Sequence, residues 1–182
     1  MKKTLSLIAI VLATASVSLA GQAVSSKKVV VAPDDCRFRA NEWQVDISAT
    51  GKVGDSSSNY NQGVGGNLGV NYFFTKYIGI GVDDSVGGTA RPGQASVGYD
   101  SLQADLLGRY PICSWNLAPY VMVGGGVSWA TTSQGNGNVG GGLEYRLTKN
   151  VALFGDCRWL FGSNGSGYLS QALPRAGVRL AF

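Results

Sequence analysis

The side chains that could do chemistry in this chain are few, and their types argue against an enzyme. The sequence contains no histidine, so the commonest general base and metal ligand is missing. A serine nucleophile also needs a neighbouring base of suitable pKa. Asp83 and Asp84 are adjacent acids inside a predicted strand, but neighbouring strand residues point to opposite faces. We therefore expect no catalytic site, no metal site and no cofactor.

The charged residues are better candidates for a structural network than for a reaction. Charged residues make up 14% of the chain and hydrophobic residues 45%, whereas average proteins carry about 25% charged residues. The formal net charge is +4 with no long basic run, so we expect no nucleic-acid partner. Five acids and six bases fall on one face of the strands predicted below: Asp46, Lys52, Asp83, Asp105, Arg109, Glu144, Arg146, Asp156, Arg158, Arg175 and Arg179.

A period of two predicts the elements that carry these residues. Between Gln62 and Phe74, apolar residues alternate with glycine and asparagine, which is typical of strands. The connections at 75–76, 111–116 and 148–149 are short, and those at 53–61, 87–96 and 163–172 are longer, while 132–136 is brief. This alternation of short and long connections is typical of membrane-spanning β-barrels. The predicted strands lie near residues 42–52, 62–74, 77–86, 97–110, 117–131, 137–147, 150–162 and 173–182.

Aromatic and glycine residues indicate which face points inward. The charged face is also rich in glycine, and an eight-stranded barrel is just wide enough for side chains to fill it. We therefore expect the charges inside the barrel and the apolar face in lipid. Aromatic residues near the strand ends predict two interfacial girdles. The first comprises Trp43, Phe74, Tyr110, Trp115 and Tyr120, and the second comprises Tyr60, Tyr99, Trp129, Trp159 and Tyr168.

The first residues predict export from the cytoplasm. Lys2 and Lys3 precede an apolar run that ends in small residues at Ser18 and Ala20. This pattern is typical of a cleaved signal peptide, and the run is short for a membrane-spanning helix. We expect a signal peptide at 1–20, a periplasmic leader at 21–41 and one barrel domain at 42–182.

The last residues resemble the insertion signal of bacterial outer-membrane proteins. A polar residue is followed by Gly177, then by Leu180 and by a terminal Phe182 at the family's spacing. Together with the glycine-rich hairpin at 139–149, these features resemble the small OmpA-like/opacity-type outer-membrane β-barrel family over residues 42–182. The resemblance implies an all-β, eight-stranded antiparallel up-and-down transmembrane β-barrel with both ends in the periplasm. It also implies a monomer in outer-membrane lipid, whose last strand is recognised by the outer-membrane assembly machinery.

Several residues need a separate interpretation within that barrel. Cys36 in the leader and Cys113 in a short periplasmic turn share an oxidising compartment, so we expect them to form a disulfide. Cys157 lies on the apolar face, where we predict a buried small hydrophobic residue. Pro174 predicts that the last strand starts or bulges there. Asp84 also falls on the apolar face, which predicts a position outside the hydrocarbon layer or a bulge that shifts the register.

Three functions fit these predictions. The first is a structural, envelope-integrity role for a barrel whose lumen is plugged by the paired charges, with loops that could contact other surfaces. The second is a small, low-conductance channel for ions or small solutes, in which the glycines leave a water-filled path. The third is a soluble periplasmic barrel that binds a lipophilic ligand. The near balance of lumen charge favours the plug, because a selective pore usually carries an excess of one sign.

Overall fold

The fold was analysed in a computed structural model that describes residues 36–54, 62–89, 97–129, 133–164 and 167–182. The predicted signal peptide, the leader as far as residue 35, and Tyr60 lie outside the described residues. Among the described residues, no helix is long and apolar enough to cross a membrane.

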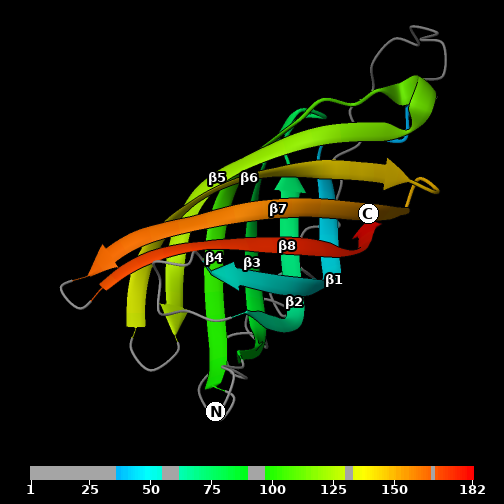
Figure 1. Cartoon of the computed structure of the whole chain (residues 1–182). Helices are drawn as coiled ribbons and strands as arrows, with labels where there is room; N and C mark the ends of the chain where they lie inside the picture. Colours follow the sequence, from blue (N-terminus) through cyan, green and yellow to red (C-terminus); the bar gives the residue numbers. More distant parts are fainter. Residues whose placement is uncertain (1–35, 55–61, 90–96, 130–132, 165–166) are drawn as a thin grey trace, which may run out of the picture. The chain divides into compact units, whose positions relative to one another are not determined.

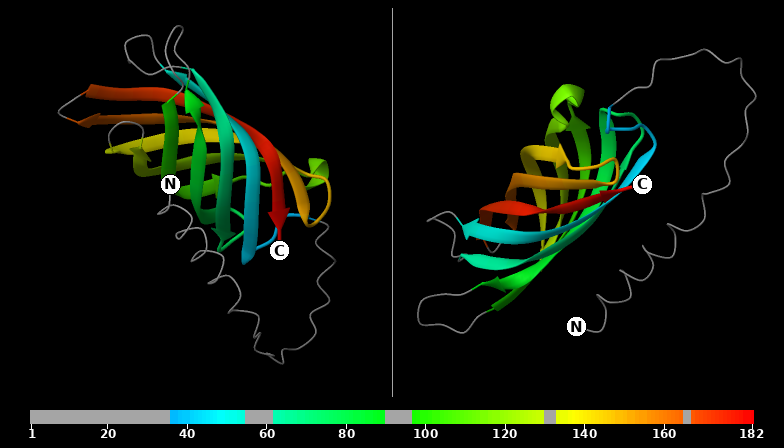
Figure 2. Two further views of the ribbon diagram at one scale, coloured as in Figure 1. Left: turned by 90° about the horizontal axis from the view of Figure 1, so that it is seen from below. Right: turned by 90° about the vertical axis from the view of Figure 1, so that its right-hand side faces the viewer.

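Eight antiparallel strands form a closed barrel in which each strand pairs with its sequence neighbours and β8 pairs with β1. Seen from two further directions, strands on opposite walls of the barrel cross at a wide angle (Figure 2). A short 3-10 helix, η1, spans Cys113–Trp115 between β4 and β5. The strands in Figure 1 are β1 (Glu42–Gly54), β2 (Gly63–Phe73), β3 (Ile78–Thr89), β4 (Val97–Arg109), β5 (Leu117–Trp129), β6 (Ser133–Arg146), β7 (Val151–Asn164) and β8 (Gly167–Ala181).

The two ends of the barrel differ in their connections. The turn end carries the start of β1, the end of β8, and the connections at 74–77, 110–116 and 147–150. Within two of these connections, the side chains of Thr75 and Thr148 accept backbone N–H bonds from the residues two and three positions later. Such local bonds are the ordinary chemistry of tight turns. The opposite end, here called the loop end, carries the other four connections, most of whose residues lie outside the described ranges.

The predicted strands are confirmed in number and order, but two of them begin earlier than expected. β6 begins at Ser133 instead of 137, and β8 begins at Gly167 instead of 173. The prediction that β8 starts or bulges at Pro174 is wrong. Pro174 pairs with Cys157 inside the strand, and the β1–β8 register has the same offset on both sides of it. The proline ring lies opposite Gly51, where an added Cβ would be 3.1 Å from the proline Cγ.

The alternation of faces places apolar side chains on the outer wall. Ile47, Val121 and Leu143 expose 57%, 64% and 53% of their surface. On soluble proteins, large exposed hydrophobic residues usually occur singly, whereas here they occur on every strand of the outer wall. Trp43, Phe74, Tyr110, Trp115, Trp129 and Trp159 are exposed as expected. The girdle prediction is wrong for Tyr120 and Tyr99, which are buried in the lumen because they share strand parity with Met122 and Ser101.

Lumen glycines allow neighbouring strands to approach closely. At Gly140 in β6, an added Cβ would lie 2.7 Å from the Cys157 carbonyl oxygen of β7, which is closer than real Cβ atoms come. Gly135 lies on the outer face of the same strand and has nothing within 4 Å of an added Cβ. The two positions show that glycine is required on the crowded lumen face but not along the whole strand.

Candidate functional site

The lumen contains the charged network. All eleven charged side chains of the predicted face are buried in the structure. A twelfth charged side chain, Glu42, was not predicted and is fully buried at the first residue of β1. Its parity with Gln44 and Asp46 was the available signal. With Glu42 included, six carboxylates and six cations line the lumen among the described strand residues.

The half of the network nearest the turn end joins three carboxylates to three arginines. Arg179 donates from Nε and Nη2 to Asp46 at 2.6 Å each, and from Nη1 to Glu144 at 2.6 Å. Arg146 donates to Glu42 at 2.5 Å and also binds Glu144. Arg109 donates to the same Glu42 oxygen at 3.0 Å. These residues come from β1, β4, β6 and β8, so the cluster connects strands that are not neighbours in the barrel.

A second cluster lies further along the lumen. Arg158 donates to Asp83 at 3.0 and 2.5 Å and to Asp105 at 2.5 Å. Arg175 binds Asp156 through Nε and Nη2 at 2.8 and 2.9 Å, and lies 3.2 Å from Asp83. The cluster thus connects β3, β4, β7 and β8. A buried ion pair offsets its desolvation only when the remaining polar atoms are also satisfied.

Neutral side chains complete the second cluster. The hydroxyl of Tyr120 donates to Asp156 at 2.6 Å, and the amide of Asn138 donates to Asp105 at 2.8 Å. The amide of Asn67 donates to Asp83 at 2.9 Å. The carboxylates therefore accept neutral hydrogen bonds in addition to the guanidinium bonds, which is the condition under which buried charges are tolerated.

The lumen towards the loop end is polar but mostly uncharged. Gln103 donates to Ser101 at 2.9 Å and accepts a bond from Asn138 at 3.0 Å. Lys52 is buried there, with its Nζ 4.7 Å from the centroid of the Tyr99 ring. The chemistry of the lumen therefore changes along the barrel, from ion pairs near the turn end to amides and hydroxyls near the loop end.

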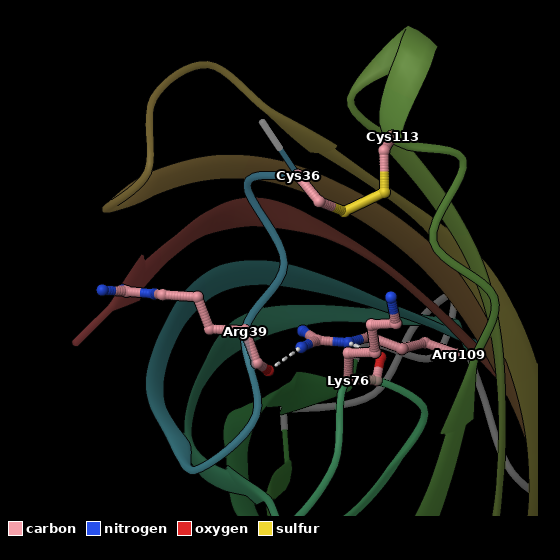
Figure 3. The surroundings of a disulfide bond; sticks show 5 residues. All are labelled: Cys36, Arg39, Lys76, Arg109 and Cys113. Atoms are coloured by element: carbon pink, nitrogen blue, oxygen red, sulfur yellow. Dashed lines mark hydrogen bonds between the residues drawn. A yellow bond between two sulfur atoms is a disulfide. The ribbon is translucent and has the colours of Figure 1, made fainter. Parts of the chain in front are cut away.

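The segment Cys36–Asn41, here called the cap, crosses the turn end of the barrel. Cys36 forms a disulfide with Cys113 of η1, and the two residues are 77 positions apart in the chain (Figure 3). Phe38 is 3% exposed, and the guanidinium carbons of Arg109 and Arg146 lie 5.2 and 5.0 Å from its ring centroid. Arg109 also donates to the Arg39 carbonyl at 3.0 Å. The cap therefore packs directly on the ion pairs nearest the turn end.

The remaining predicted residues lie outside this network. Phe182 is 64% exposed at the turn end, and Leu180 pairs with Val45 of β1 and Val151 of β7. Gly177 packs against the β1 backbone at Ile47 and Ser48, where an added Cβ would clash. Within the described residues, no group of histidine, cysteine, aspartate and glutamate side chains has the arrangement of a metal site.

On the outer wall, Cys157 differs from its prediction, and one of the two alternatives predicted for Asp84 is wrong. Cys157 is a free thiol on the outer face, but it is exposed instead of buried because the strand points it away from the lumen. Asp84 pairs in unbroken register with Leu68 and Leu102, so no bulge turns its side chain inward. It stays on the outer face and is partly exposed.

Comparisons with known proteins identify the fold but no close relative. No protein-family model matches the sequence, and no curated protein sequence matches it. Neisserial surface protein A, a solved structure, matches with a TM-score of 0.62 at 16% identity, covering 78% of this chain and 96% of its own. This chain has the fold of the small outer-membrane barrels. The predicted resemblance is thereby confirmed for the fold.

Two further structures limit what this fold implies. The N-terminal β-barrel domain of Pseudomonas aeruginosa OprF matches with a TM-score of 0.51 at 21% identity, covering 79% of this chain and 99% of its own. A de novo designed transmembrane β-barrel matches with a TM-score of 0.52 at 18% identity, covering 79% of this chain and 98% of its own. Natural and designed proteins thus share the small outer-membrane barrel fold, so the function must be argued from the lumen and the surface.

Proposed function

We propose that this chain is a structural, non-enzymatic protein of the bacterial outer membrane, whose lumen is closed by a plug of paired charges. It is exported through a signal peptide at residues 1–20, and residues 21–41 precede the barrel in the periplasm. The apolar outer wall supports a position in lipid. The closed barrel supports it as well, because no strand edge is left with unpaired backbone groups in the bilayer. The turn end then faces the periplasm, where short turns are found in this class of barrel.

The observation that carries the proposal is the set of ion pairs between strands that are not neighbours. Arg158 of β7 reaches Asp83 of β3, and Arg109 of β4 reaches Glu42 of β1. Side chains from opposite walls therefore meet inside the barrel, and the cap lies beneath them with Phe38 buried. Each guanidinium that binds two carboxylates holds two strands at a fixed separation, so the network also braces the barrel.

A narrow channel is the second candidate function. The observation that favours it is the loop-end half of the lumen, which is lined by amides and hydroxyls such as Gln103, Ser101 and Asn138. Such a lining suits water and small polar solutes. The balanced charge argues against ion selectivity, and the two ion-pair clusters would have to rearrange for any solute to pass.

A soluble barrel that binds a lipophilic ligand fits this geometry poorly. Such a protein needs apolar side chains inside and charges in water, whereas here Arg146 and Glu144 are fully buried and Val121 is 64% exposed. The polarity of the two faces is the reverse of what that function needs.

Single-channel recording of the refolded protein in a planar lipid bilayer tests the proposal. We expect insertion without discrete current steps for the wild type, because the plug closes the lumen. Arg146→Ala and Glu144→Ala, which each break the network, are expected to raise the frequency of openings. Reproducible steps in the wild type, changed in size by these substitutions, would make the protein a channel. Protein that stays in the aqueous phase would exclude the membrane location.

We further propose that Gly177, Leu180 and Phe182 form the signal that the outer-membrane assembly machinery recognises. Phe182→Ser should then lower the amount of folded protein in the outer membrane while leaving unaided folding in detergent unchanged. Equal outer-membrane levels of the wild type and this variant would refute the assignment. A matched control is Phe74→Ser, which removes an exposed aromatic residue from a turn at the same end.

A further inference from the structure

The cap brings two arginines to the turn that carries Lys149, so three cations gather there. Arg37 donates from Nη1 to the carbonyls of Arg146 and Leu147 at 2.7 and 2.6 Å. Arg39 donates from Nη2 to the Lys149 carbonyl at 3.4 Å, and Lys149 itself is exposed. Residues far apart in the sequence are thus gathered around the connection between β6 and β7.

The acids near this turn are too few to balance its cations, although Arg39 forms an ion pair with Glu42. Glu42 lies 3.4 Å from Arg39, but it already accepts hydrogen bonds from Arg109 and Arg146 inside the lumen. Glu144, the next acid on β6, is bound to Arg146 and Arg179. Both carboxylates are fully buried. Among the described residues of this turn and the cap, the outward-facing charge is therefore positive.

Apolar side chains adjoin the cations on the outer wall. Tyr145 and Leu147 are each 46% exposed, and Leu153 on β7 is also 46% exposed. A cationic group directly beside an exposed aromatic and aliphatic surface matches the boundary between headgroups and acyl chains. A free anion or a water-soluble acidic polymer would need the cations but not the apolar neighbours.

We propose that Arg37, Arg39 and Lys149 bind the phosphate of an anionic phospholipid headgroup in the leaflet facing the turn end. Tyr145 and Leu147 contact the upper part of its acyl chains. Guanidinium groups suit phosphate because their parallel N–H groups can bind two oxygens. The disulfide holds the cap against the barrel and so keeps the two arginines beside Lys149. This inference rests on the proposed membrane location.

The test uses the full chain, refolded into zwitterionic phosphatidylcholine bicelles and titrated with phosphatidylglycerol. The side-chain Nε–H resonances of Arg37 and Arg39 report binding directly. We expect saturable shifts with phosphatidylglycerol and none with added phosphatidylcholine or with inorganic phosphate at equal concentration. Shifts with inorganic phosphate alone would mean a general anion site, and a soluble acidic polysaccharide that competes would mean a polymer partner. Either result would overturn the lipid assignment.

Variants separate charge from fold. Each cation near an anionic membrane surface contributes about fivefold in affinity. Lys149→Gln should therefore weaken binding about fivefold, and Arg37→Gln with Arg39→Gln by more than tenfold. Lys76→Gln is the matched control, because Lys76 lies in the β2–β3 turn on the opposite side of the barrel. An equal loss with Lys76→Gln would refute the proposal.

Two more variants keep the test decisive. Arg37→Lys with Arg39→Lys retains the charge and should bind within a few-fold of wild type. If it binds as weakly as the glutamine pair, the loss comes from the fold of the cap and the proposal fails. Cys36→Ser with Cys113→Ser should weaken binding at least as much as Lys149→Gln does, because the two arginines are then no longer held beside Lys149. Failure to insert into phosphatidylcholine bicelles would instead count against the membrane location itself.

Discussion

Arg158→Met tests whether the lumen network behaves as coupled ion pairs. Arg158 on β7 is 2% exposed and donates across the lumen to Asp83 of β3 and Asp105 of β4, which are neighbouring strands. Methionine keeps much of the volume but removes the charge and every donor. Asp83 still has Arg175 at 3.2 Å and the Asn67 amide at 2.9 Å. Asp105 keeps the neutral Asn138 amide bond at 2.8 Å but loses the guanidinium that it binds directly.

The expected loss of stability follows from the Asp105 carboxylate, which no longer binds a guanidinium. Removing one partner of a buried ion pair costs about 3–5 kcal/mol, whereas replacing the whole pair with groups of similar shape is often nearly neutral. Adding Asp105→Asn to Arg158→Met removes the charge of that carboxylate and preserves an acceptor for Asn138. We expect the double variant to recover at least about 2 kcal/mol of the loss.

Urea unfolding in phospholipid vesicles, followed by tryptophan fluorescence, measures these differences. Arg39→Met is the matched control, because the Arg39 side chain is 41% exposed and makes one ion pair of 3.4 Å. Its expected cost is below about 1 kcal/mol. The reasoning fails if the double variant is no more stable than Arg158→Met, or if the Arg39 and Arg158 substitutions cost the same.

Three other perturbations test separate parts of the fold by the same unfolding assay. Gly140→Ala should destabilise the barrel by about 1–3 kcal/mol, because the added Cβ overpacks against the Cys157 carbonyl oxygen, whereas Gly135→Ala meets nothing within 4 Å and should change stability little. Equal effects would contradict the close approach of β6 and β7 at Gly140. Cys36→Ser with Cys113→Ser should lower the free energy of unfolding by about 2–4 kcal/mol, because the disulfide closes a loop with a sequence separation of 77. The strand content seen by circular dichroism should not change, and a loss of that signal would mean that barrel closure depends on the disulfide. Tyr120→Phe should lower the free energy of unfolding by about 1.5–3 kcal/mol, because it removes the 2.6 Å hydrogen bond to the Asp156 carboxylate. Unchanged stability would mean that Arg175 alone satisfies that carboxylate.

The strand pattern could be predicted from the sequence because lipid and lumen select opposite side chains at alternate positions. Parity placed Arg146 and Asp83 in the lumen without any knowledge of their partners. The same rule places Tyr120 and Tyr99 inside, whereas their aromatic type and their positions near strand ends predict the girdles. The early starts of β6 and β8 were missed because Ser133–Asn136 and Gly167–Ser170 have the composition of loops.

The pairing within the network and the position of the cap could not be predicted in this way. The lumen ion pairs join strands such as β3 and β7. Which of their residues lie at the same level along the barrel axis depends on strand tilt and register around the whole barrel, and local sequence does not determine that level. The cap has no periodicity, and its contacts are single side chains such as Phe38 packing on Arg109. The shared compartment predicted the disulfide between Cys36 and Cys113, but not the contacts of Phe38 with the ion pairs.

The cross-lumen pairing has a consequence for the order of assembly. Arg179 on β8 binds Asp46 on β1 across the seam between the first and last strands, and Glu144 on β6 binds the same guanidinium. The Arg179–Asp46 pair cannot form until the seam between the first and last strands has closed. Before closure these two charges lack each other as partners, and an unpaired charge is tolerated only where water reaches it. We therefore expect pairing of the first and last strands and loss of water from this ion pair to occur in the same step.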